Sequence, residues 1–147
     1  MIFTGIENET LEFKIVGYEI PENQGPSYEA NFLYIELDVK SVHRNWHTDN
    51  CALSTTDVEK IIDWFYRLQQ NNIVIRDLEF IEKGISFEYL QQTNSQVQFR
   101  ILLHSDCTPN DMKNFHINFK LNEKELKVVH ESLQKELSAF PTRGFEK

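Results

Sequence analysis

Cysteine is scarce in this chain, and its scarcity excludes a disulfide-rich scaffold. The 147 residues contain only Cys51 and Cys107, which lie far apart and outside any close-paired spacing. Small secreted domains that depend on disulfides carry more cysteines at regular spacings. The sequence therefore predicts a reduced intracellular protein, with a single bridge between the two cysteines as the alternative.

Long apolar runs are also absent. Nowhere do about 18 apolar residues follow one another, which is the length that indicates a membrane-spanning helix. The N-terminus lacks a basic segment followed by a continuous apolar stretch, which is the pattern of a secretion signal. We therefore expect a cytoplasmic protein without a membrane partner.

Basic residues are too few for a typical nucleic-acid-binding protein. The chain has 15 lysines and arginines against 23 aspartates and glutamates, which gives a formal net charge of -8. This balance opposes nucleic-acid binding, and it favours either simple solubility or attraction to a basic partner protein. The length fits one globular domain over residues 1–147.

The motifs of several large enzyme classes are missing. The chain has no glycine-rich phosphate loop, no nucleophile-elbow serine and no closely paired cysteines or histidines. These absences argue against several large enzyme classes, and we predict no metal and no cofactor.

Two looser groups of residues leave other chemistry open. His43, His47 and Cys51 recur at regular intervals. A strand would place His47 and Cys51 on one side about 13 Å apart, which is too far for one zinc ion.

The second group lies in one polar loop. His104, Asp106 and Cys107 are close enough in the sequence to donate metal ligands, although such groups more often simply hydrate a loop. Cys107 could also act as a nucleophile with His116 as its base, if folding brings the two side chains within hydrogen-bonding distance.

Alternation between apolar and polar residues predicts the strands. The two-residue period runs through residues 10–18, 32–41, 97–103 and 115–121, and a shorter strand is predicted at 46–53. Apolar residues also alternate on both sides of Gly84, at 78–80 and 85–89, which predicts a tight hairpin.

Two helices are predicted from their caps and apolar stripes. Ser54 or Thr55 can cap the first helix, whose end is expected at 70–72, and Asn122 can cap the second, which is expected to end before Phe140-Pro141. Their stripes are Val58, Ile61, Ile62, Phe65 and Leu68, and then Leu126, Val129, Leu133 and Leu137. All these elements together predict an α+β fold: an antiparallel sheet of about six to seven strands, strongly curved or sandwich-like, with one inserted helix and one C-terminal helix.

The predicted strand at 32–41 has two different faces. One face is apolar and comprises Leu33, Ile35, Leu37 and Val39, whereas the other comprises Phe32, Tyr34, Glu36 and Asp38. The second face is a solvated surface, an interface with another protein, or a surface whose rings lie under a helix. Glu36 and Asp38, with Cα atoms about 7 Å apart, could also serve acid–base chemistry or hold a cation.

A series of motifs resembles the WapI family of bacterial immunity proteins over nearly the whole chain. The matching segments are "GYEIP", "YEANFLYIEL", Trp46, "TTDVEKIIDWF", "LEFIEKGISFEYL" and "LQKELSAFPTRG". Phe32 stands where the family usually has tryptophan, Ile20 replaces a common aromatic residue, and Lys83 occupies a frequent proline position. The matching residues are mostly scaffold features, so the resemblance implies a role without identifying contact residues.

The resemblance implies a non-enzymatic, cytoplasmic protein that neutralises a toxin delivered by a neighbouring cell, as in contact-dependent inhibition. Its partner would be the C-terminal domain of the cognate toxin, and the acidic charge favours a basic domain such as a nuclease, blocked by stoichiometric occlusion. The candidate contact residues are Glu19, Glu22, Tyr28, Glu29, Phe32, Tyr34, Glu36 and Asp38. The alternatives are a small-ligand-binding or adaptor module, and an enzyme built on the cysteine–histidine or carboxylate groups.

Overall fold

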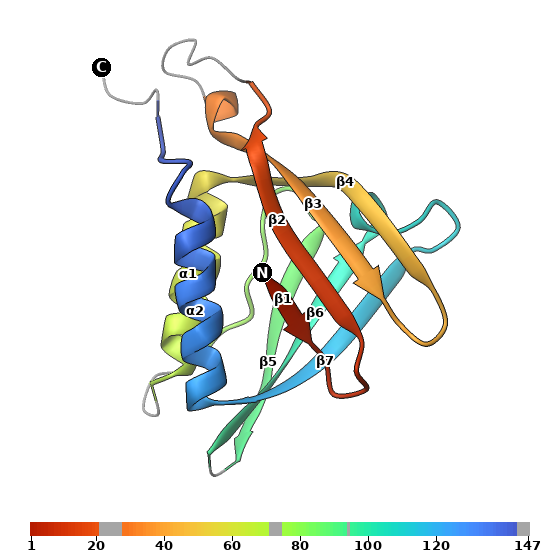
Figure 1. The fold of residues 1–147 in the computed structure, drawn as a ribbon, viewed down its shortest axis with the longest axis vertical. Coiled ribbons are helices and arrows are strands. Elements are labelled where there is room, and N and C mark those ends of the chain that lie inside the picture. Colours follow the sequence, from red (N-terminus) through yellow and green to blue (C-terminus); the bar gives the residue numbers. More distant parts are fainter. Residues whose placement is uncertain (21–27, 71–74, 94, 144–147) are drawn as a thin grey trace.

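The structure of the protein is a computed structural model that describes residues 1–20, 28–70, 75–93 and 95–143 (Figure 1). Its strands are β1 (Ile2–Thr4), β2 (Thr10–Tyr18), β3 (Phe32–Lys40), β4 (Asn45–Ser54), β5 (Ile85–Thr93), β6 (Gln96–His104) and β7 (Asn114–Asn122). Its helices are α1 (Thr55–Leu68) and α2 (Glu123–Leu137), and two short 3₁₀ helices are η1 (Tyr28–Asn31) and η2 (Ser105–Cys107).

The strands of the described residues form two antiparallel sheets. One has the order β1-β2-β3-β4, and the other has the order β5-β6-β7. Figure 1 shows α1 and α2 side by side along one flank of the strands, where α1 contacts β4 and α2 contacts β2 and β7. The predicted α+β class with an inserted and a C-terminal helix is confirmed, and the strands divide between two sheets.

Both helices begin at the predicted caps. Ser54 and Asp57 form a capping box at the start of α1, and Asn122 and Glu125 form another at the start of α2. α1 ends at Leu68, and of the stop residues expected at 70–72, positions 71 and 72 lie outside the described residues. Neither helix, within the part of the chain that the structure describes, is long and apolar enough to cross a membrane.

Aromatic rings connect the two sheets to α1 in the core. Phe99 stacks on Phe119 with ring centroids 5.0 Å apart, and Phe65 of α1 lies 5.4 Å from Phe99. Trp64, which the predicted stripe omitted, is also buried and donates its indole N–H to the Arg76 carbonyl at 2.7 Å. Burying each ring contributes about 1.5–3 kcal/mol, so this cluster is a main source of stability.

The predicted hairpin around Gly84 is only partly formed. The segment before Gly84 contributes a single antiparallel bridge between Leu78 and Phe87 instead of a strand. Two residues after Phe87, the Tyr89 amide donates to the Asp77 carboxylate at 3.0 Å, so a side chain accepts where a carbonyl of a neighbouring strand would. The sequence pattern did not predict the short β1, which pairs with β2 at the edge of the four-stranded sheet.

Two β-bulges shape the outer surface of the four-stranded sheet. The pairing of β2 with β3 shifts register between Ile15 and Gly17. In the pairing of β3 with β4, Asp49 and Asn50 together lie opposite Glu36. A bulge changes which side chains face outward, and here it leaves both Asp49 and Asn50 exposed. β4 extends one residue beyond each end of the strand predicted at 46–53.

Cys51 and Cys107 form a disulfide, with Cα atoms 5.3 Å apart. The prediction of two free thiols is thus wrong for this structure, and the single bridge kept as the alternative is present. The sequence conceals the pairing because the cysteines are 56 residues apart, and only the packing of η2 against β4 brings them together. Both cysteines are buried.

The segment after α2 folds back over the end of β2 and over η1. The Tyr18 hydroxyl donates to the Pro141 carbonyl at 2.6 Å, and the Arg143 guanidinium lies 3.7 Å from the centroid of the Tyr18 ring. The buried Asn31 side chain accepts from the Arg143 amide at 2.8 Å and donates to its carbonyl at 2.7 Å. This C-terminal clasp, formed by Tyr18, Asn31, Pro141 and Arg143, holds the end of β2 and η1 against the segment after α2.

Candidate partner-binding face

The outer surface of β2, β3 and β4 carries more carboxylates than amines. We call this surface the acidic face; its ionisable side chains are Glu12, Lys14, Glu19, Tyr34, Glu36, Asp38, Lys40, His47 and Asp49. All are exposed or half-buried, because alternate positions of a strand point away from the core. Tyr34, near the start of β3, is 41% exposed, so its ring faces solvent and is not buried under a helix.

The acidic face is hollowed beside Tyr34. The acidic hollow has a volume of about 290 Å³ and is lined by Glu19, Tyr34, Asp49, Asn50, Cys51 and Ala52. The Tyr34 hydroxyl donates to the Asp49 carboxylate at 2.9 Å. The bulge in β4 makes this bond possible because it turns Asp49 outward toward β3.

The surrounding carboxylates raise the pKa of Tyr34 at the acidic hollow. The hydrogen bond to Asp49 raises this pKa above its ordinary value, and the charges of Asp49, Glu36 and Glu19 raise it further. An ammonium or guanidinium group entering the hollow would meet the same carboxylates with the favourable sign.

His47 and Asp38 form a second polar pair on the acidic face. His47 Nδ1 and Asp38 Oδ1 lie 3.0 Å apart across β3 and β4. The hydrogen bond to Asp38 raises the pKa of His47, and the charges of Asp38, Glu36 and Asp49 act in the same direction. The imidazole therefore gains positive charge more readily than a free histidine.

The structure brings together only part of the predicted contact set. Glu19, Tyr34, Glu36 and Asp38 share the acidic face, and Phe32 at the start of β3 is half-buried. Glu22 lies outside the described residues, and only the backbone of Tyr28 and Glu29 is described, in η1.

His47 and Asp49 were missed as members of this surface. Their alternation within β4 was visible in the sequence, but nothing in it revealed that β4 pairs with β3 beside Tyr34 and Asp38.

The bulge in β4 places His47 and Cys51, which belong to the first group considered for metal binding, on opposite faces of the sheet. His47 faces solvent, whereas Cys51 faces the core in its disulfide, because the extra residue reverses the alternation between them. The sequence had placed both on one side of a strand, and that expectation is wrong. Among the residues that the structure describes, no three histidine, cysteine or acidic side chains are grouped to hold a metal ion.

The predicted nucleophile and base do not meet either. Cys107 is buried in the disulfide, and His116 is exposed on β7 opposite Leu102 of β6. The cysteine–histidine pair kept as an enzymatic alternative is therefore not formed.

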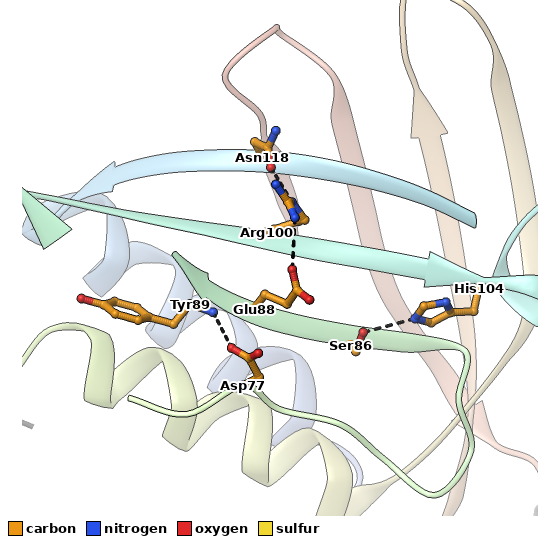
Figure 2. A network of polar contacts seen from close by, with 7 residues as sticks. All are labelled: Asp77, Ser86, Glu88, Tyr89, Arg100, His104 and Asn118. Carbon is orange, nitrogen blue, oxygen red and sulfur yellow. Dashed lines mark hydrogen bonds and ion pairs between the residues drawn. The ribbon is translucent and has the colours of Figure 1, made fainter. Parts of the chain in front are cut away.

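A different polar network crosses the outer surface of the three-stranded sheet, and Figure 2 shows its members. Arg100 of β6 donates to Asn118 of β7 and to Glu88 of β5, at 2.8 and 3.2 Å. Near the start of β5, the Ser86 hydroxyl lies 3.2 Å from Nε2 of His104 (Figure 2). Nδ1 of the same imidazole lies 3.0 Å from the Asn114 side chain, so the ring is held from both sides.

The Ser86 and His104 side chains border a second hollow. It has a volume of about 310 Å³ and is lined by Glu79, Phe80, Lys83, Ile85, Ser86 and His104. A serine bonded to an oriented histidine is the arrangement in which a histidine activates a hydroxyl. Here the orienting group is Asn114, which is uncharged and stabilises an imidazolium less than a carboxylate would.

The motifs that carried the family resemblance have structural roles. Trp46 donates its indole N–H to the Cys107 carbonyl at 3.1 Å and packs against Phe115, with ring centroids 5.0 Å apart. Tyr18 and Arg143 form the C-terminal clasp. These residues fix the scaffold, whereas Glu19, Tyr34 and Glu36, which belong to the same motifs, lie on the acidic face.

Comparison with known proteins gives the family. The sequence profile described as the Immunity protein WapI-like family matches residues 1–141. A comparison with curated proteins gives no match. Because the family profile covers nearly the whole chain, the protein belongs to the WapI-like family of immunity proteins.

Proposed function

We propose that this protein is a cytoplasmic, non-enzymatic immunity protein that binds the C-terminal domain of its cognate toxin and blocks it by stoichiometric occlusion. Membership of an immunity family supports the role. The observation that carries the location of binding is the open acidic face, with Tyr34 exposed beside the acidic hollow.

The chemistry of the acidic face favours a basic partner, such as a nuclease whose nucleic-acid groove is positively charged. Carboxylates distributed over one face accelerate the encounter with an oppositely charged protein. Tyr34 supplies the aromatic anchor, since tyrosine is among the residues that contribute most to binding at interfaces. A lysine or arginine of the toxin would enter the acidic hollow and contact Glu19 and Asp49.

Co-expression tests the proposal directly. The chain is produced in a sensitive cell together with the C-terminal domain of the large secreted protein encoded next to it. We expect growth to be rescued and the two proteins to co-elute on size-exclusion chromatography. Failure of both would contradict the immunity assignment for that pair.

A matched pair of tyrosine variants tests the location. Tyr34→Ala on the acidic face should weaken toxin binding by at least about 1 kcal/mol, measured by calorimetry. Tyr66→Ala on α1 removes a ring of similar exposure, 49% against 41%, and should leave binding unchanged. If the two variants weaken binding equally, the acidic face is not the docking site.

A second candidate function, the binding of a small ligand, is favoured by the hollow beside Ser86 and His104. Its apolar floor of Phe80 and Ile85 and its polar rim resemble a small-molecule site. Small molecules are screened by thermal shift with the wild-type protein and with His104→Ala. A ligand of this hollow would raise the melting temperature of the wild type only. Equal shifts, or none, would count against this function.

A further inference from the structure

Ser86, His104 and Asn114 form a chain of hydrogen bonds across the three-stranded sheet. They come from β5, β6 and β7 and lie at the same end of that sheet, because the strands are antiparallel. Ser86 Oγ lies 3.2 Å from His104 Nε2, and His104 Nδ1 lies 3.0 Å from Asn114 Oδ1. Figure 2 shows Ser86 and His104 pointing toward each other from adjacent strands. A hydroxyl, an imidazole and a group that orients the imidazole are thus connected.

The bond to Asn114 determines which nitrogen of the imidazole faces Ser86 as an acceptor. The amide oxygen Oδ1 only accepts hydrogen bonds, so His104 Nδ1 carries the hydrogen of this contact. In a neutral imidazole the other nitrogen, Nε2, is then an acceptor, and the Ser86 hydroxyl donates to it. This is the state in which a histidine acts as a general base toward a hydroxyl.

The hydroxyl and the imidazole are both reachable from the hollow of about 310 Å³ that they line. Along β5, Ile85 and Phe87 face the core, so Ser86 between them faces outward. Ser86 and His104 are half-buried, and the exposed Lys83 lines the same hollow. A small molecule in the hollow can therefore contact the hydroxyl, with a cation nearby to attract negative charge that develops on a carbonyl oxygen.

We propose that Ser86 is an acylation site that takes an acyl group from small activated esters, with His104 as general base and Asn114 as its positioning residue. Ser86 Oγ attacks the ester carbonyl while its proton passes to His104 Nε2. The bond from the carbonyl carbon to the leaving oxygen then breaks, and the leaving group takes that proton from His104 and departs as an alcohol. The product is an ester on Ser86, with one acyl group transferred to each protein molecule.

This acylation differs both from toxin binding and from enzymatic turnover. The uncharged Asn114 stabilises an imidazolium less than a carboxylate would, so we expect a slower reaction than in a serine hydrolase. A single transfer modifies the protein, which is compatible with a non-enzymatic immunity role. Because the reaction requires only the isolated protein, its failure would leave the proposed immunity function untouched.

Labelling of the full-length protein with p-nitrophenyl acetate tests the proposal. Release of p-nitrophenol is followed by absorbance, and peptide mass spectrometry locates the acetyl group. We expect Ser86 to be acetylated at least about tenfold faster than Ser105, an exposed serine of η2, because general-base assistance typically contributes about 10²- to 10⁴-fold in enzymes. Acetyl groups found on lysines but not on Ser86 would overturn the proposal.

A matched pair of histidine variants tests the base. His104→Ala should slow the acetylation of Ser86 at least about tenfold. His116→Ala removes an exposed imidazole from β7, opposite Leu102, and should leave the rate unchanged. Equal losses in the two variants would show that His104 is not the base for Ser86.

Asn114→Asp tests the positioning residue through a gain, which a loss of structure could not produce. A carboxylate still accepts from His104 Nδ1 and stabilises the imidazolium, so acetylation of Ser86 should become at least about fivefold faster. Asn118→Asp places the same charge on β7 beside Arg100 and should change the rate by less than about twofold. If neither variant accelerates the reaction, or both do so equally, the proposed chain does not act on Ser86.

Discussion

His47 and Asp38 pair on the exposed surface of β3 and β4, and this contact should make the stability of the protein depend on pH. The folded pKa of His47 is raised, chiefly by the hydrogen bond to Asp38. The pair therefore adds stability that is fully present below the pKa of an unfolded histidine, about 6.5, and is lost as pH rises through the raised folded value. Asp38→Asn should lower the pKa of His47, measured by NMR titration of the ring protons.

Glu36→Gln is the control for the His47 titration. Glu36 raises the pKa of His47 by its charge alone, as a smaller cause than Asp38. We expect Glu36→Gln to lower the pKa of His47 less than Asp38→Asn does. If the two substitutions act equally, the hydrogen bond is not the main cause of the shift.

Gly84 is the residue at which the addition of one methyl group should be most costly. Its Cβ would lie 2.7 Å from Cys107 Sγ in a buried site, so the disulfide or β5 would have to move. Gly84→Ala should lower the free energy of unfolding by about 1–3 kcal/mol, measured by urea denaturation. Gly17→Ala, whose Cβ has no neighbour within 4 Å, should change it by less than about 1 kcal/mol.

At the scale of elements, the C-terminal clasp holds η1 and the end of β2 against the segment after α2. Asn31 is 1% exposed and bonds both backbone groups of Arg143. Asn31→Ala should lower the free energy of unfolding by about 1–3 kcal/mol, because it removes two hydrogen bonds that a buried side chain makes to part-buried backbone groups of Arg143. Asn110→Ala, at an exposed turn, should change it by less than about 0.5 kcal/mol. Equal effects would show that the clasp does not contribute to stability.

Most elements could be predicted because their signals are local. The apolar alternation of residues 10–18 matches β2, and both capping boxes are visible as short motifs. β1 was missed because three residues are too short to show a period. The segment before Gly84 has a strand pattern but forms a single bridge, since the Asp77 side chain replaces backbone pairing.

The candidate site was harder to predict than the fold because it depends on strand pairing. The outward face of β3 was visible as alternation, and Tyr34, Glu36 and Asp38 do lie together on the surface. The contributions of His47 and Asp49 depend on the register of β4 and on its bulge, which no local pattern encodes. The disulfide depends likewise on a contact between β4 and η2.

At the scale of the whole molecule, part of the net charge of -8 lies on the acidic face, and under the proposed function this face guides a basic toxin. Glu36→Lys with Asp38→Lys reverses charge at the centre of the acidic face. It should slow association with the toxin on the order of tenfold at low salt, measured by stopped-flow fluorescence, and the difference should shrink as salt is raised. Dissociation should change less, because peripheral charges act mainly on the encounter.

The control variant has the same net charge as Glu36→Lys with Asp38→Lys, but its substitutions lie on another surface. Glu59→Lys with Glu131→Lys makes the same total change on the exposed surfaces of α1 and α2. Association slowed equally by both pairs would mean that the toxin responds to overall charge, and the acidic face would lose its role in steering. Slowing confined to the β3 pair would place the encounter on the four-stranded sheet, because only a local field distinguishes two proteins of identical net charge.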